Sequence, residues 1–468
     1  MDQTPASPPS TPPSSSILKV GFDERLPAAR TGLFGLQHLL ALTGIWIFPV
    51  LIGSSLKLTQ LQVSYIVQGC FLMTGLITLL QSSRLLRLPI VQGPTAAFFA
   101  ALTAAGATFG LGTAFGSMTV AGLIFMALSV PIRKFGLFGH IARVAATPVV
   151  FGTLFVIIGA QLAVIGLPGW FGVKGLPGYG STNFWISVVT VVVVLGCLVL
   201  GGHTLVRRGA VVWGIAAGSL VAAVAGVWSP SFDGSRLLGA PQALPFGFGV
   251  EWSVVVLMLL AFLQAGAESS GMYQLIGGWG GEKVSLERTN RGLFTEFLGT
   301  TVGSLFGGIG TTSYPENAGI VRITGVGSRY VTATAGAAAL VLAFVPSVAL
   351  FLAGLPGPVL SAASTVLFGI IAMSGVQMLS AVEWDDLNLA VTAPAFIISL
   401  GTQFLPADLT DPLPDAARTF VSSPMMLGIV LLIVLHVAVN LGLRPLLERR
   451  GAPAPATPAT AEGAEVPA

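Results

Sequence analysis

Residues 251–276 read EWSVVVLMLLAFLQAGAESSGMYQLI, an apolar run in which Glu268 is the one charged residue after the first position. A helix that crosses a bilayer needs about 20 predominantly apolar residues, so this run is long enough to span a membrane. A charged side chain at the bilayer centre costs roughly 2.5–3.5 kcal/mol on insertion scales, and such residues usually mark function. The stretch therefore predicts a membrane protein with a working carboxylate inside it.

The composition of the whole chain agrees with this interpretation. Of 468 residues, 53% are hydrophobic and 9% are charged, whereas a soluble domain carries about 25% charged residues. The net charge is only +3, and the basic residues are spread through loops instead of forming the patch that nucleic-acid binding requires. We therefore expect the lipid bilayer as a partner and no nucleic acid.

Thirteen further apolar runs, counted outward from residues 251–276, predict a polytopic transmembrane domain over residues 19–445. Residues 1–18 are rich in Pro and Ser, and residues 446–468 are rich in Ala and Pro, so both read as disordered tails. The two cysteines lie inside apolar runs without metal-ligand spacing, and we expect neither a metal nor a cofactor. The fourteen predicted spans are 33–53, 62–82, 91–107, 116–131, 146–166, 184–201, 209–228, 251–276, 291–309, 313–327, 330–353, 358–378, 387–404 and 424–443.

The distribution of Lys and Arg tests this count independently. With the N-terminus in the cytoplasm, 18 of the 22 basic residues fall on the cytoplasmic side, and the other four are Lys57, Lys174, Arg236 and Arg418. Cytoplasmic loops carry an excess of Lys and Arg, so the pattern supports fourteen spans. The sequence predicts a multi-pass protein of the plasma membrane, here a bacterial inner membrane, with both termini in the cytoplasm.

Two of the predicted spans are short and interrupted. The third carries Gly93-Pro94 near its start, and the tenth carries Pro315, Glu316 and Asn317. They take the third place in each half of seven, as in transporters built from inverted repeats, whose half-helix N-termini face a substrate near the bilayer midplane. A structural kink would explain either break alone, but the matched positions favour a site. The predicted fold is all-α, with 7+7 inverted repeats and discontinuous segments 3 and 10.

Three carboxylates fall within the predicted spans. Small residues surround Glu268 and would leave room for a ligand, although packing against another helix is the alternative. Glu316 follows Pro315 where a half-helix should begin, so helix capping is its alternative role. Glu296 is five residues from Arg291 and reads equally well as a residue near the cytoplasmic surface. Glu268 and Glu316 together would form an acceptor pair for a ligand rich in N–H donors, and buried carboxylates are candidates for proton uptake.

The polar residues His38 and Asn317 also fall in apolar settings. A lone buried histidine is more often a packing hydrogen-bonder than a proton relay, and Asn317 reads as a tie between helices. The four histidines lie in separate places, so a membrane enzyme would lack the clustered reacting groups that catalysis needs. Carboxylates beside helix breaks also suit specific binding better than the fast conduction of a channel.

Residues 316–325, ENAGIVRITG, resemble the signature of the nucleobase–ascorbate transporter family. In that signature Gln, Glu or Pro precedes Asn-x-Gly, and Thr follows five residues after that Gly. Further matches extend the resemblance over about residues 20–445; they are FDERLP at 22–27, Gln37-His38, LPIVQG at 88–93, Glu268 followed by Gly271, and Asn290-Arg291-Gly292.

The resemblance implies a core domain from segments 1–4 and 8–11 and a gate domain from segments 5–7 and 12–14, usually in a homodimer. Family members import a nucleobase, xanthine or uracil for this chain, together with protons or, in some relatives, Na⁺, by an elevator-like movement of the core. Glu268 and Glu316 would accept hydrogen bonds from ring N–H groups, and Tyr314 would flank the ring. Glu268 and His38 would couple the proton. The implied substrate-binding set is Glu268, Glu316, Tyr314, Pro315, Ala96, Ala97, Phe98 and Asn317.

Three departures from the family pattern leave the exact base open. Ala96 stands where many relatives carry an aromatic residue, with Phe98 two positions on, and Met272 stands where uracil and xanthine members commonly place His or Asp. Glu316 leans toward uracil, while the following GVGSRYV leans toward purines. An anion transporter of the related architecture shares the broken helices, but two carboxylates disfavour a bound anion.

Overall fold

The computed structural model describes residues 18–42, 44–132, 136–145, 147–202, 205–229 and 237–451. Most of the two expected tails lies outside these ranges, as do Arg133, Lys134 and Arg236. The last described helix continues to Gly451, so the first residues of the expected C-terminal tail are helical.

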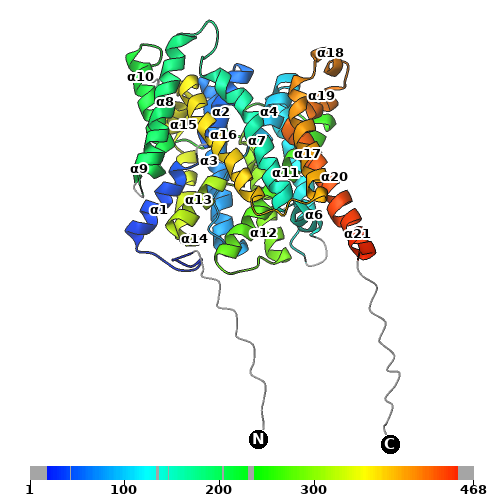
Figure 1. Ribbon diagram of the computed structural model, residues 1–468. Helices are drawn as coiled ribbons and strands as arrows, with labels where there is room; N and C mark the ends of the chain where they lie inside the picture. The colour runs from blue at the N-terminus through cyan, green and yellow to red at the C-terminus, as the bar shows by residue number, and fades with distance from the viewer. Residues whose placement is uncertain are drawn as a thin grey trace, which may run out of the picture.

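The described chain is almost entirely helical (Figure 1). Its first half contains α1 Ala28–Leu40, α2 Gly44–Leu56, α3 Gln60–Leu80, η1 Gln81–Leu85, β1 Gln92–Pro94, α4 Ala96–Phe109, α5 Leu111–Leu128, α6 Leu137–Ala145, α7 Pro148–Gly169, α8 Ser181–Leu200, α9 Leu205–Arg208 and α10 Ala210–Val224. Its second half contains α11 Trp252–Trp279, α12 Leu286–Ser304, β2 Thr311–Ser313, α13 Pro315–Thr324, α14 Arg329–Ala343, α15 Pro346–Ala353, α16 Gly357–Leu379, α17 Asp386–Gly401, η2 Thr402–Phe404, α18 Ala407–Thr410, α19 Asp415–Val421, α20 Pro424–Leu435, η3 His436–Leu443 and α21 Arg444–Gly451.

Many of these helices can cross a membrane. In the described part of the chain, eight are long and apolar enough, or up to nine if the bent pair α14 and α15 counts as one span. Three shorter apolar helices, Ile47–Leu56, Ala96–Phe109 and Ala210–Val224, accompany them. In Figure 1, α1 and α21 lie at one end of the bundle and α18 and α19 at the other. The protein is therefore a mostly helical, multi-pass membrane protein.

Two runs that the sequence analysis treats as single spans are divided. The expected span 330–353 bends by 88° between α14 and α15, because Pro346 disfavours helical geometry at Val345, whose φ and ψ are −118° and 80°. The expected span 33–53 is divided into α1 and α2. At that division the amide of Gly44 donates to the hydroxyl of Tyr314, the N-cap residue of α13, instead of a carbonyl one turn back.

The two predicted interruptions meet as a short antiparallel strand pair. In the register of β1 and β2, Gln92 faces Ser313 and Pro94 faces Thr311. Each strand leads directly into a helix, β1 into α4 and β2 into α13. The extended conformation before Pro315 follows from the steric demand of proline on the preceding residue. The pairing brings the N-terminal ends of α4 and α13 together.

Close helix packing is provided by small residues. An added Cβ at Gly75 of α3 would stand 2.5 Å from the backbone nitrogen of Leu340 in α14, and one at Gly159 of α7 would stand 2.5 Å from Ala372 in α16. Small residues let helix backbones approach closely in membrane proteins. Helices α7 and α16 pack along their length, α8 lies against α10 and α16, and α17 and α20 lie against α7. The strand pair is contacted by α2, α3, α11 and α12, whereas α5 packs on α11 and α12 and α14 packs on α3.

Candidate functional site

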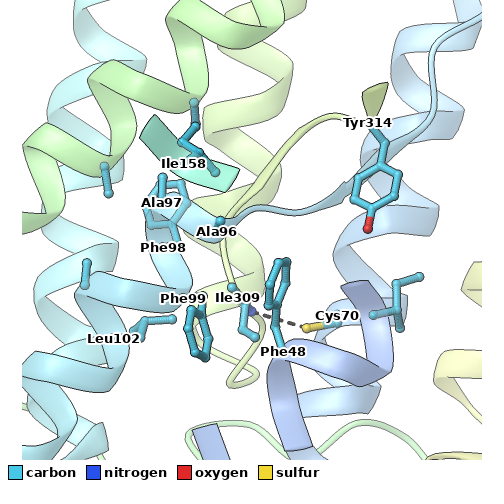
Figure 2. Packing of buried hydrophobic residues seen from close by; sticks show 14 of the residues in the cluster. Phe48, Cys70, Ala96, Ala97, Phe98, Phe99, Leu102, Ile158, Ile309 and Tyr314 are labelled. Atoms are coloured by element: carbon cyan, nitrogen blue, oxygen red, sulfur yellow. Dashed lines mark hydrogen bonds between the residues drawn. The ribbon is translucent and has the colours of Figure 1, made fainter. Parts of the chain in front are cut away.

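A cavity of about 40 Å³ lies where the starts of α4 and α13 meet α2, α7 and α11. Figure 2 shows Ala96 between Ile158 and Tyr314, with the ring of Phe48 beside them. This volume holds on the order of three water molecules, so the planar base that the resemblance implies would fit only if the cavity widened. The lining residues are Phe48, Pro94, Thr95, Ala96, Phe155, Ile158, Glu268, Thr312, Tyr314 and Pro315.

Glu268 is the carboxylate in this lining, and its residue is 6% exposed. Its position follows from the next residue on α11, because Ser269 ties the helix to β2. The Ser269 hydroxyl accepts the Ser313 N–H at 2.9 Å and lies 3.1 Å from the Thr312 hydroxyl. Thr312 in turn donates to the Ala265 carbonyl at 3.3 Å. The strand thus fixes which face of α11 is turned to the cavity.

The small residues around Glu268 do not leave the open space that the sequence suggests. An added Cβ at Gly266 would stand 2.3 Å from the ring of Phe138 and 2.8 Å from that of Phe297, and one at Gly271 would stand 3.2 Å from Phe151. Aromatic rings from neighbouring helices therefore fill these positions. The cavity lies on the side of Glu268 that faces the starts of α4 and α13.

Tyr314 forms an aromatic wall of the cavity and is held at its hydroxyl. The hydroxyl oxygen accepts the backbone N–H of Gly44, at the start of α2, at 2.9 Å. Phe48 forms a second wall, and Phe99 stacks on it at a centroid distance of 5.3 Å. The rings of Tyr314 and Phe48 offer apolar faces suited to a flat ligand.

Of the three residues expected from the start of α4, Ala96 lines the cavity, whereas Ala97 and Phe98 are absent from its lining. The Ala97 N–H donates to the Thr95 hydroxyl at 3.3 Å. The Phe98 ring packs edge-on against Phe262 at 4.8 Å, away from Tyr314 (Figure 2). Two residues along an α-helix turn a side chain by about 200°, so Ala96 and Phe98 point to opposite faces.

The two predicted polar residues His38 and Asn317 contact each other. The His38 Nδ1–H donates to the Asn317 Oδ1 at 3.0 Å, and both residues are 1% exposed. This bond ties α1 to α13. Pro315 lines the cavity, and the backbone of Glu316 is the second residue of α13. The Glu316 side chain lies outside the described part of the structure.

A second buried carboxylate, Glu296 of α12, lies behind the strand pair. It is fully buried, and its Oε2 accepts the Gln92 amide at 2.9 Å and the Tyr273 hydroxyl at 3.2 Å. Gln92 also donates toward Gln81 and Ser313. The sequence left open whether Glu296 lies in the protein interior or near the cytoplasmic surface, and the structure places it in the interior. In the sequence, the polar Gln92 beside the Gly93-Pro94 break was the available signal of a buried polar cluster. The pairing of Gln92 with Glu296 on α12 depends on tertiary packing, which the sequence does not show.

The helical bundle, the buried carboxylate and the paired helix starts define a membrane transporter. The Permease family model Xan_ur_permease matches residues 29–407, and the chain belongs to this family. It is a family of transporters, not of enzymes. The resemblance to nucleobase transporters found in the sequence is therefore confirmed.

Curated relatives match over most of their length. The chain is 30% identical to the nucleobase transporter PlUacP of Paenibacillus larvae, covering 87% of this chain and 94% of the relative. It is 29% identical to the uric acid permease PucK of Bacillus subtilis, covering 88% and 96%, and 26% identical to the xanthine permease of the same species, covering 88% and 94%.

Among solved structures, the transmembrane domain of the cyanobacterial bicarbonate transporter BicA is similar, with a TM-score of 0.59 at 13% identity. The match covers 90% of this chain and 100% of that domain. At this identity the likeness supports the fold alone.

Proposed function

We propose that this protein imports a nucleobase, a purine such as xanthine in the first place, by symport with a cation, which we take to be a proton. The observation that carries the proposal is that Glu268 lines a cavity at the meeting point of two helix starts. A carboxylate accepts hydrogen bonds from ring N–H groups, and helix-start amides, which lack intrahelical partners, donate to ring carbonyls.

We assign the expected binding residues to two roles on the basis of their contacts. Glu268, Ala96, Tyr314 and Pro315 line the cavity and are proposed to contact the base, with Glu316 as the second acceptor. The remaining residues support these contacts: Ala97 through the cap of α4, Phe98 through aromatic packing, and Asn317 through its bond to His38. Proton coupling is assigned to Glu268, with His38 holding α13 in place.

The finer architecture is part of the same proposal. Fourteen segments in two inverted repeats would form a core around the strand pair and a gate from α7, α8, α10, α16, α17 and α20. Two features support this division: the packing of α7 against α16, and the position of Phe155 and Ile158 of α7 across the cavity from Glu268. An elevator-like movement of the core, a homodimer, and a bacterial inner-membrane location with cytoplasmic termini complete the proposal.

The choice of substrate draws on the names of the relatives, which transport nucleobases, uric acid and xanthine. Xanthine and uric acid are therefore tested first, and uracil, which the Glu at 316 suggests, is tested beside them. The second candidate is an anion, because a bicarbonate transporter shares the fold. A carboxylate in the cavity lining disfavours bicarbonate, an anion without ring N–H donors, by like-charge repulsion.

Uptake by purified protein in liposomes tests the proposal. Labelled xanthine, uric acid, uracil and bicarbonate are offered with and without an acidic exterior, using wild type, Glu268→Gln and the control Glu287→Gln, whose carboxylate is exposed and pairs with Arg291. Loss of a charge-assisted hydrogen bond, about 1.5–3 kcal/mol, should raise KM about 10- to 100-fold in Glu268→Gln and leave the control unchanged.

The possible outcomes separate the parts of the proposal. Unchanged uptake in Glu268→Gln refutes the assigned role of Glu268. Bicarbonate uptake without base uptake refutes the substrate class. Base uptake that follows a Na⁺ gradient and ignores the pH gradient refutes the proton as the coupled cation.

A further inference from the structure

The interruption between helices α1 and α2 is the third helix interruption that lies beside the cavity, after those that precede α4 and α13. The backbone N–H of Gly44, the first residue of α2, is buried and donates to the Tyr314 hydroxyl at 2.9 Å. We propose that Gly44 is a positioning residue that sets the orientation of the Tyr314 ring and thereby the width of the slot for a flat substrate. This inference rests on the proposed function, because the slot has a role only if a planar base enters it.

The Tyr314 ring is fitted between two glycines from different elements. An added Cβ at Gly44 would stand 2.7 Å from the Tyr314 hydroxyl oxygen, and an added Cβ at Gly93 of β1 would stand 2.5 Å from the ring atom Cδ2. Both distances are shorter than real carbon contacts. The Tyr314 side chain therefore explains the glycine at both positions: its hydroxyl lies against Gly44, and its ring carbons lie against Gly93.

Backbone conformation does not require glycine at either position. Neither Gly44 nor Gly93 has a positive φ, so alanine is allowed by the backbone at both. What alanine would disturb is the ring of Tyr314 and, at Gly44, also the Phe48 ring and the Pro94 carbonyl, whose Cε2 and oxygen each lie 3.2 Å from the added Cβ. Tyr314 and Phe48 are both walls of the cavity, so a methyl group at Gly44 alters the slot itself.

A wall that is held before the substrate arrives improves binding because less side-chain freedom is lost on association. The Gly44 amide supplies this restraint at the hydroxyl, the end of Tyr314 farthest from its own backbone. Glu268 gives the slot its polar acceptor, and the Gly44–Tyr314 contact gives it its shape. We therefore assign to Gly44 an effect on discrimination between one-ring and two-ring bases as well as on affinity.

The two glycines allow a selective rescue experiment. Tyr314→Phe removes the atom nearest to a methyl group at position 44, the hydroxyl oxygen at 2.7 Å, and leaves Phe48 Cε2 and the Pro94 carbonyl oxygen, each at 3.2 Å. It keeps the ring carbons that a methyl group at position 93 would strike. We expect Gly44→Ala to raise the KM for xanthine about tenfold, the equivalent of 1.4 kcal/mol. Tyr314→Phe alone should raise it about three- to tenfold through loss of one hydrogen bond.

The double variant Gly44→Ala/Tyr314→Phe should recover most of the way to the level of Tyr314→Phe alone, whereas Gly93→Ala/Tyr314→Phe should remain as impaired as Gly93→Ala. KM, maximal rate per folded transporter and the ratio of KM for xanthine to that for uracil are measured in liposomes. The maximal rate should change less than twofold while the KM ratio shifts.

Equal rescue of both glycine variants, rescue of neither, or a Gly44→Ala protein that matches wild type in KM and KM ratio would overturn the inference. If wild type transports no base, the proposed function fails by itself. The Gly44–Tyr314 contact is then tested by the unfolding temperature. Gly44→Ala should lower this temperature, and adding Tyr314→Phe should raise it again. Adding Tyr314→Phe to Gly93→Ala should not raise it. The two failures are thus distinguishable.

Discussion

Replacement of Ser269 by alanine removes the hydroxyl that holds α11 against β2. Its neighbour Ser270 supplies a matched control on the same helix. Both residues are 0% exposed, and both substitutions delete the same single oxygen atom. The Ser269 hydroxyl bonds the Ser313 N–H and the Thr312 hydroxyl, whereas the Ser270 hydroxyl has no partner among the described residues.

The expected magnitudes follow from these contacts. In Ser269→Ala the Ser313 N–H becomes a buried donor without its acceptor, which costs about 1–3 kcal/mol. The Thr312 hydroxyl keeps the Ala265 carbonyl as an acceptor, so its loss adds little. We expect the free energy of unfolding to fall by about 2 kcal/mol in Ser269→Ala. In Ser270→Ala the free energy of unfolding should not fall, and it should rise by up to about 1–3 kcal/mol, because the substitution removes a buried hydroxyl that has no partner among the described residues.

The assay combines the unfolding temperature of the detergent-purified protein with the KM for base uptake. Ser269→Ala should lower the unfolding temperature and raise KM together, since the Ser269 bond also aligns Glu268 with the cavity. Ser270→Ala should not lower the unfolding temperature and should leave KM unchanged. Equal destabilisation by the two substitutions would refute the reasoning, because it would show that packing around the hydroxyl, and not its hydrogen bonds, decides the cost.

Two further predictions concern ties at α13 and at the loop before α1. Single and double replacement of His38 and Asn317 by alanine should show a coupling of about 1 kcal/mol in unfolding free energy; additive effects would contradict the 3.0 Å bond between them. Arg329 and, with it, Arg87 hold the pKa of Asp23 below its usual value, so the stability from this carboxylate is present above its unfolded pKa of about 3.9 and is lost as pH falls through the lower folded pKa. Because Asp23 is half-exposed, Asp23→Asn should cost less than about 1 kcal/mol at neutral pH and nothing in acid below both pKa values, as measured by thermal unfolding; a difference that persists in acid would count against the ion pairs.

The sequence was informative where local chemistry decides the structure. Run lengths predicted a multi-pass helical protein, and Gly93-Pro94 and Tyr314-Pro315 predicted the starts of α4 and α13, because proline forces the preceding residue out of helical geometry. Glu268 was singled out by its charge in an apolar run, and it does line the cavity. These signals depend on a few neighbouring residues only.

Features set by tertiary contacts were harder to predict. The direction of Phe98 depends on which face of α4 meets the cavity, and hydropathy does not distinguish faces in a helix that is apolar all round. Glu296 is close in sequence to Arg291 yet is buried by Gln92 and Tyr273, which come from other elements. The separation of α1 from α2 coincides with a hydrogen bond to Tyr314, 270 residues away.

The pairing of β1 with β2 also limits how the chamber can change size. These strands join the two halves of the chain through buried backbone groups. Separating α4 from α13 would leave those groups without hydrogen-bond partners, at a free-energy cost of about 1–3 kcal/mol for each group. The opposite wall, Phe155 and Ile158 on α7, meets the cavity through side-chain carbon alone, where sliding breaks no hydrogen bond. Widening of the cavity for a substrate is therefore least costly along α7. The helices α4 and α13, joined by the strand pair, would then move together as one rigid unit.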